Sequence, residues 1–171
     1  MAHKMLSAHR WAIIFSFVFL TGAAGPAEAI EADEALTVAR QIPEAVAFLS
    51  LFDGNYKHCI EEEVVKSCES DWVTCLEDGW VVRFSYKESC GVINDGRLQL
   101  TIVVDGSGKV ISRFPEEMYF KVPRYCLEDY DCLSVLPSGC LNFIYGPFYE
   151  VSHTDNLCVC QSGRCGLKAA E

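Results

Sequence analysis

Basic residues are scarce in this chain of 171 residues, which has 14 Lys and Arg against 24 Asp and Glu. The formal net charge is −10, and four histidines add little to it. A surface this acidic repels phosphate backbones, so nucleic acid is not an expected partner. The simplest interpretation of the acidity is solubility, and a cationic partner is the alternative.

Several motifs of catalytic, redox and modified sites are missing. The chain has no Asn-x-Ser/Thr acceptor, no C-x2-C pair beside a βαβ pattern and no G-x-S-x-G nucleophile elbow. Ser107 lies between two glycines, where a hairpin turn is expected. Asp105-Gly-Ser-Gly has the start of a calcium motif but lacks the twelve-residue loop and its terminal Glu. Both patterns therefore predict a plain turn rather than a site.

Long apolar runs are also lacking. The longest mostly apolar stretch near the start, residues 11–24, has 14 residues, whereas a membrane-spanning helix needs about 20. A short basic lead precedes it, and Ala27-Glu-Ala29 follows. This order is typical of a secretory signal peptide over residues 1–29, cleaved between Ala29 and Ile30. An uncleaved membrane anchor is the alternative; after cleavage no membrane association is expected.

The ten cysteines all follow the predicted cleavage point. They are Cys59, Cys68, Cys75, Cys90, Cys126, Cys132, Cys140, Cys158, Cys160 and Cys165. An even count behind a signal peptide predicts disulfides and a periplasmic or extracellular location. The gap after Cys90 divides them into four and six, so each group can close on itself. Four cysteines allow three pairings and six allow 15, and the sequence leaves these open.

Residues 32–52 have the periodicity of a helix. Apolar residues recur at spacings of four, four and three, and we expect them to face the core: Val38, Ile42, Val46 and Leu49. Pro43 interrupts this pattern, because proline removes a backbone donor and clashes with the preceding turn. We expect a kink there, or two short helices with Pro43 in the first turn of the second.

Alternating apolar residues predict antiparallel strands at 79–87, 97–104 and 109–114. Asn94-Asp-Gly96 is a strong turn signal before the second of them. Residues 56–79 carry no clear pattern. The expected fold class is therefore α+β, with a kinked N-terminal helix packed on a three- to four-stranded antiparallel sheet and a small disulfide-rich C-terminal module.

A domain boundary is predicted near residue 122, which gives an α+β domain at 30–122 and a cysteine-rich domain at 123–171. The second domain is too small to rely on apolar burial alone, so bridges are the expected support. Cys158-Val-Cys160 and the Cys165 that follows predict a closing hairpin. Residues two apart share a face of a strand, so Cys158 and Cys160 should reach different partners.

Four groups of residues are candidates for a site. Glu61-Glu-Glu63 is expected to be a solvated face, with a cation site as the alternative. Glu128, Asp129 and Asp131 are expected in a solvated loop, again with a cation site as the alternative. A zinc site would combine His153 with Cys158, Cys160 and Cys165, although the spacing is unlike structural zinc sites. The aromatic group Phe143, Tyr145, Phe148 and Tyr149 is either the small core of the tail or a binding surface.

The order of the first domain resembles a known family. This order consists of a helix, then Trp80-Val-Val-Arg-Phe84, then Leu100-Thr-Ile-Val-Val-Asp105, then Gly108-Lys-Val110. It is similar to that of the exported modules of the PepSY type, which have a cystatin-like layout. The resemblance covers residues 33–114 and implies an α+β module. It implies no catalytic residue and no cofactor. Family members include segments that restrain peptidases, so the resemblance implies a role in protein binding.

The sequence thus predicts an exported, disulfide-stabilised, non-enzymatic protein that binds an unidentified protein partner, with restraint of a peptidase as one version. One alternative is a metal-binding or thiol-redox protein that uses the C-terminal cysteines. Another is an exported enzyme whose site is assembled from residues far apart in the chain. The oligomeric state is left open.

Overall fold

The computed structural model describes residues 29–71, 73–90, 98–152 and 158–168. Its N-terminal part begins with two helices, α1 (Ala32–Gln41) and α2 (Pro43–Leu51). They meet at Ile42, whose extended backbone separates them, and Pro43 opens the second helix. Proline is favoured there because the first turn leaves its backbone donor unused. The prediction of two short helices broken at Pro43 is confirmed.

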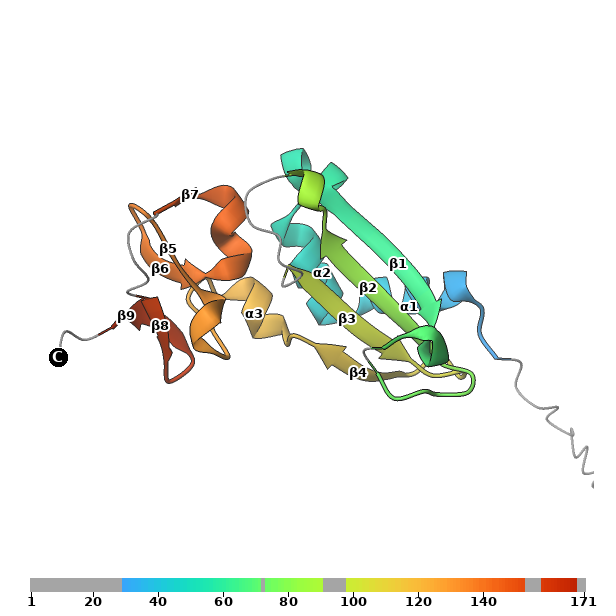
Figure 1. The fold of residues 1–171 in the computed structure, drawn as a ribbon. Coiled ribbons are helices and arrows are strands. Elements are labelled where there is room, and N and C mark those ends of the chain that lie inside the picture. The colour runs from blue at the N-terminus through green and yellow to red at the C-terminus, as the bar shows by residue number, and fades with distance from the viewer. Residues whose placement is uncertain (1–28, 72, 91–97, 153–157, 169–171) are drawn as a thin grey trace, which may run out of the picture.

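A four-stranded antiparallel sheet lies against these helices (Figure 1). Its strands are β1 (Ile60–Lys66), β2 (Trp80–Tyr86), β3 (Gln99–Val104) and β4 (Val110–Phe114), in the order β1-β2-β3-β4. Leu100, Ile102 and Val104 of β3 are fully buried. The α+β class, with helices on one face of the sheet and a small disulfide-rich C-terminal module, is confirmed. The turn signal at 94–96 lies outside the described residues.

The sequence did not predict β1. Its core-facing positions are Ile60, Glu62, Val64 and Lys66, so polar residues replace half of the expected apolar ones. The two polar residues have specific partners: Glu62 pairs with Arg40 of α1, and the Lys66 ammonium lies 3.7 Å from the centre of the Trp80 ring. The pattern was missed because these partners come from other elements.

The apolar stripe predicted for the helices is only partly correct. Val46 is 51% exposed, while Ala45, Ala47 and Phe48 are buried. The break before Pro43 rotates α2 relative to α1, so one stripe does not continue through both helices. As a result Phe48, not Val46, carries the core contact of α2.

The turn between β3 and β4 is organised by one carboxylate. Oδ1 of Asp105 accepts hydrogen bonds from the backbone N–H of Ser107 at 2.9 Å, from the Ser107 hydroxyl at 2.6 Å and from the backbone N–H of Lys109 at 3.0 Å. Gly108 has φ +83°, a conformation that glycine adopts without strain. The hydrogen bond from the Ser107 side chain is the largest cause of the lowered pKa of Asp105, followed by that from the Lys109 amide.

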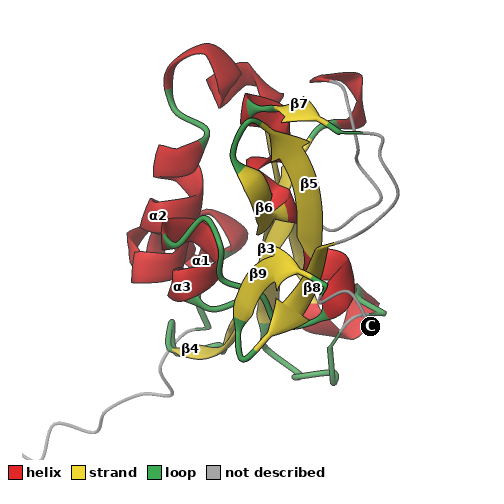
Figure 2. Ribbon diagram, turned by 90° about the vertical axis from the view of Figure 1, so that its left-hand side faces the viewer, coloured by secondary structure: helices red, strands yellow, loops and turns green. Residues whose placement is uncertain are grey.

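The C-terminal part begins with the short helix α3 (Glu117–Lys121), which packs on α2. One sheet has the order β6-β5-β7, with β5 at Cys132–Leu136, β6 at Gly139–Asn142 and β7 at Glu150–Val151. The predicted closing hairpin is confirmed as β8 (Cys158–Gln161) and β9 (Arg164–Leu167). In Figure 2, β5, β6, β8 and β9 lie in front and α1, α2 and α3 gather at one side.

The hydrophobic core continues from the N-terminal part into the tail. The ring of Phe148 lies 5.5 Å from that of Phe52 in the segment after α2 and 4.9 Å from that of Tyr56. Phe48 in turn contacts Phe120 of α3, with 5.3 Å between ring centres. We call these five residues the aromatic junction. Because one core spans both parts, the packing of each part depends on the other; the domain boundary near residue 122 stays a prediction.

Replacing Phe148 with Ala should destabilise the whole chain. The substitution removes contacts to both Phe52 and Tyr56, and we expect a loss of about 2–3 kcal/mol in the free energy of unfolding, since the ring is half-buried. Phe114→Ala is the matched control: this ring is 65% exposed and its removal should cost less than about 0.5 kcal/mol. Urea unfolding with the disulfides intact measures both. Equal losses would show that the junction does not hold the two parts together.

The Asp105 turn should make stability depend on pH. The hydrogen bonds of the turn hold the pKa of Asp105 below its ordinary value, so its charge stabilises the fold above that value and the contribution is lost as pH falls through the folded-state pKa. Asp105→Asn keeps an oxygen acceptor but removes the charge. The difference in Tm between wild type and this variant should be present at neutral pH and shrink in acid. Ser107→Ala removes the main cause of the lowered pKa of Asp105, so it should weaken the same pH dependence. A Tm difference between wild type and Asp105→Asn that stays constant across pH would contradict the stabilising role of the Asp105 charge.

Candidate functional site

All ten cysteines form disulfides. The pairs are Cys59–Cys90, Cys68–Cys75, Cys126–Cys160, Cys132–Cys165 and Cys140–Cys158. The first four cysteines and the last six thus close among themselves, as the spacing predicted. Cys158 and Cys160 reach different partners, which is also confirmed. The tail bridges form a buried cluster, in which Cys126, Cys140, Cys158 and Cys165 are almost inaccessible.

The tail cysteines do not offer zinc ligands in this oxidised state, because a metal is bound by thiolates and these sulfurs are bonded to sulfur. His153, the other residue of the predicted zinc site, lies outside the described residues. Among the residues that the structure describes, two groups have ligand atoms close together: His58 with Cys59 and Cys90, and Cys126 with Cys132 and Cys165. In both groups every cysteine is part of a disulfide. The metal-binding alternative therefore requires reduction first.

The acidic run 61–63 lies in β1 and is exposed, as predicted. Glu62 pairs with Arg40 on the face of the strand that points toward the helices. Glu63 pairs with Arg83 of β2 at 2.5 Å on the opposite face. Alternate residues of a strand point to opposite faces, so consecutive carboxylates diverge. Two of the three are already paired with arginines, so the run does not assemble a cation site.

The prediction of a solvated loop at Glu128, Asp129 and Asp131 is wrong for Asp131, which is 6% exposed. Its Oδ2 accepts from the backbone N–H of Leu127 at 2.7 Å and of Glu128 at 2.9 Å. Its Oδ1 accepts from the Tyr119 hydroxyl at 2.9 Å. Asp131 is thus a buried structural acceptor that ties the tail to α3. The sequence shows the acidic cluster but not this partner, which lies 12 residues earlier.

Asp129 has a structural role too: Oδ1 accepts from the backbone N–H of Cys160 at 2.9 Å. The bond connects the acidic segment to β8, so this carboxylate is also engaged within the fold. Asp105 is likewise engaged, by three donors of its own turn. The prediction of a plain turn at residues 105–108 is confirmed, and Ser107 serves that turn as a donor.

The aromatic group at 143–149 is mainly core. Phe143 and Tyr145 are buried, and the Tyr145 hydroxyl donates to the Phe120 carbonyl at 2.8 Å. Burial is the main cause of the raised pKa of Tyr145, with Tyr149 adding to it. Phe148 belongs to the aromatic junction, and Tyr149 is exposed. The core these residues fill is shared with the helices, whereas the sequence indicated a small core of the tail alone.

A surface hollow of about 780 Å³ lies beside α1, α2 and β1. The positive and negative side chains of its lining are equal in number. Three are basic, Arg40, Lys57 and Lys87, and three are acidic, Asp53, Glu61 and Glu62. Arg40 and Glu62 already pair with each other.

The strand at 109–114 was predicted, but its exposed apolar edge was not singled out from the sequence. It is the last strand of the sheet, and four of its five residues are exposed. Phe114 is 65% exposed and Ile111 is 46% exposed; Met118 in the following helix is also exposed. Arg113, the charged residue of β4, pairs with buried Glu44 at the start of α2. The strand therefore presents large apolar side chains beside an edge, and alternation alone does not reveal which strand lies at an edge.

Comparisons with known proteins add no assignment to this geometry. No family model, no curated protein and no solved structure matches the chain. The resemblance to PepSY-type modules therefore stays a prediction from the motifs, and the functional argument rests on the residues described above.

Proposed function

We propose that this chain is exported, is stabilised by its five disulfides and acts by binding another protein, without catalysing a reaction. The observation that carries the proposal is the exposed edge of β4, with Phe114 and Ile111 beside it. Edge strands of monomeric proteins are usually protected by outward charges, because unpaired backbone groups attract other strands. In β4 the charged side chain turns to Glu44 instead.

The partner that fits this edge is an extended segment of another protein. Such a segment gains backbone hydrogen bonds to β4, and an apolar side chain on it covers Phe114. The net charge of −10 favours a segment with basic residues, through attraction that speeds encounter. Restraint of a peptidase is the specific version that the resemblance to PepSY-type modules supports, since members of that family restrain peptidases.

Export is supported by the disulfides and by the start of the predicted mature chain. Five disulfides are typical of proteins from oxidising compartments. Ile30 is buried, its backbone N–H donates to the Gly106 carbonyl at 3.0 Å, and its carbonyl accepts from the Trp80 indole at 2.9 Å. The first residue after the predicted cleavage is thus anchored to the fold. Within the described ranges, no helix is long and apolar enough to span a bilayer.

A photo-reactive phenylalanine analogue tests the binding surface. Placed at Phe114 in the exported protein, it should cross-link to a discrete partner in the exported fraction of the producing cells, because the edge of β4 is the proposed contact. Placed at Tyr149, an exposed aromatic of the tail, it should not. Excess unlabelled wild type should abolish the cross-link, and excess Phe114→Asp should not. Cross-links of equal yield at both positions would contradict the proposal.

The peptidase version is tested separately with the purified protein. When the wild-type protein is added to the peptidases of the same exported fraction, the cleavage of a fluorogenic casein substrate should fall. The Phe114→Asp variant should reduce this cleavage less. Unchanged cleavage, together with a specific cross-link at position 114, would refute peptidase restraint and leave protein binding in place.

Intact mass tests export and oxidation. The protein recovered after export should begin at Ile30 and should be lighter than its reduced form by the ten hydrogens that five disulfides remove. A mass that retains residues 1–29, or cysteines that react with iodoacetamide without reduction, would contradict the exported, oxidised state.

A further inference from the structure

The Cys59–Cys90 bridge lies at one end of the sheet, where two short 3-10 helices meet the β1–β2 pair. Cys59 ends the first (Gly54–Cys59) and Cys90 ends the second (Glu88–Cys90). The backbone N–H of Lys87 donates to the Cys59 carbonyl at 2.7 Å, which holds the two segments side by side. Cys59 is 3% exposed, whereas Cys90 is half-buried. Cys90 is therefore the more exposed cysteine of this bridge.

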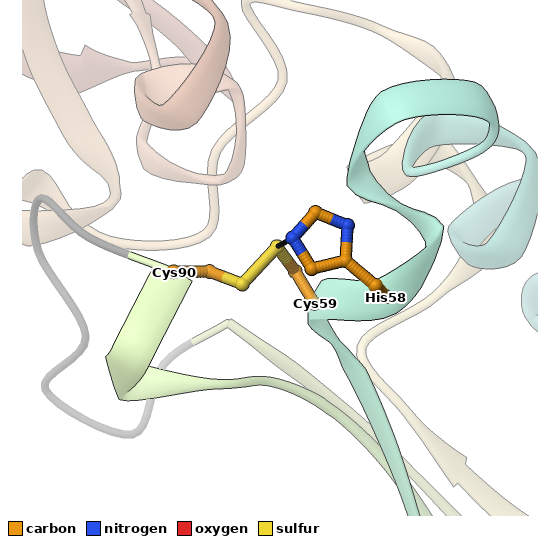
Figure 3. Close-up of side chains that lie close together, drawn as sticks. All are labelled: His58, Cys59 and Cys90. Carbon is orange, nitrogen blue, oxygen red and sulfur yellow. Dashed lines mark hydrogen bonds between the residues drawn. A yellow bond between two sulfur atoms is a disulfide. The ribbon is translucent and has the colours of Figure 1, made fainter.

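An imidazole stands against this bridge. Nε2 of His58 lies 3.4 Å from Sγ of Cys59, and Figure 3 shows the ring beside the sulfur–sulfur bond, on the side of Cys59. His58 itself is exposed. Lys87 Nζ donates to the His58 carbonyl at 3.0 Å, and Lys57 precedes it in the chain. The imidazole thus contacts the bridge directly, and the Lys87 ammonium binds the backbone beside it, while the acidic Glu88 lies in the same 3-10 helix as Cys90.

The other bridges have different surroundings. Those of the tail are packed against one another in a buried cluster. The Cys68–Cys75 bridge is exposed, but Sγ of Cys68 lies 3.5 Å from the Leu76 carbonyl oxygen, which would repel a thiolate. A thiolate leaves a disulfide more readily when a neighbouring group such as an imidazole donates a hydrogen bond to it, and exchange also requires access to the other sulfur. Among the described residues, the Cys59–Cys90 bridge combines both conditions.

We infer that Cys59–Cys90 is a thiol-exchange site, whose substrate class is a small-molecule thiol. The thiolate of the substrate attacks Sγ of Cys90, a mixed disulfide forms there, and the Cys59–Cys90 bond breaks. Cys59 leaves as a thiolate within hydrogen-bond reach of Nε2 of His58. A second thiolate then attacks the sulfur of the substrate in the mixed disulfide, which releases the substrate as its own disulfide and Cys90 as a thiolate. The two cysteine thiolates take up the two protons that the substrate thiols gave up. Two substrate thiols are oxidised, and one protein disulfide is reduced.

Reduced glutathione serves as the probe on the oxidised protein. Samples are quenched in time with an alkylating reagent, digested and mapped by mass spectrometry. The glutathione adduct should appear on Cys90 rather than on Cys59, and free Cys59 should appear before any tail cysteine. This measurement needs no variant. An adduct on Cys59, or opening of the tail bridges at the same time, would overturn the inference.

His58→Gln tests the role of the imidazole. It should slow the opening of Cys59–Cys90 roughly two- to fivefold, the range expected for the loss of one exposed hydrogen bond. Lys57→Gln is the matched control, because it removes a neighbouring cation that no sulfur contacts in the structure, and its effect should be smaller. The Cys68–Cys75 bridge is the internal reference, and its rate should be unchanged in both variants. An unchanged Cys59–Cys90 rate in His58→Gln would overturn the role of His58.

Discussion

The packing of the aromatic junction is the contact on which the rest of the structure depends. Phe48 and Phe52 fix α2 against the sheet, and Phe120 and Phe148 bring α3 and the tail onto the same rings. A tail of this size cannot bury enough apolar surface to pack by itself. It uses the side chains of the helices instead, so the sheet, the helices and the tail share one core.

The disulfides support each part but do not connect the two. All ten cysteines are in the described part of the chain, and no bridge joins a residue before position 122 to one after it. Aromatic packing therefore acts across the junction together with hydrogen bonds such as that from the Tyr56 hydroxyl to the Pro147 carbonyl. The bridges reduce the entropy of the unfolded chain, while the junction sets how the parts are oriented.

Local patterns in the sequence predicted those elements whose determinants are local. The break at Pro43, the strands β2 and β4 and the Cys158–Cys160 hairpin follow from rules that span a few residues. The strand β1 and the burial of Asp131 were missed, because Arg40, Trp80 and Tyr119 make these polar positions favourable from distant segments. The candidate surfaces could not be predicted for the same reason. Tertiary structure determines that β4 lies at an edge of the sheet and that His58 contacts a sulfur.

The proposed binding edge and the proposed exchange site are both connected to the junction. β4 continues through Pro115 into α3, where Phe120 packs on Phe48. The 3-10 helix that carries His58 and Cys59 also carries Tyr56, whose ring contacts Phe148. β1 and β4 are opposite edges of the sheet, so the two sites do not touch, but the ladder β1-β2-β3-β4 joins them. The segment of Tyr56 is thus connected to the β4 edge by two routes, the strand ladder and the aromatic junction.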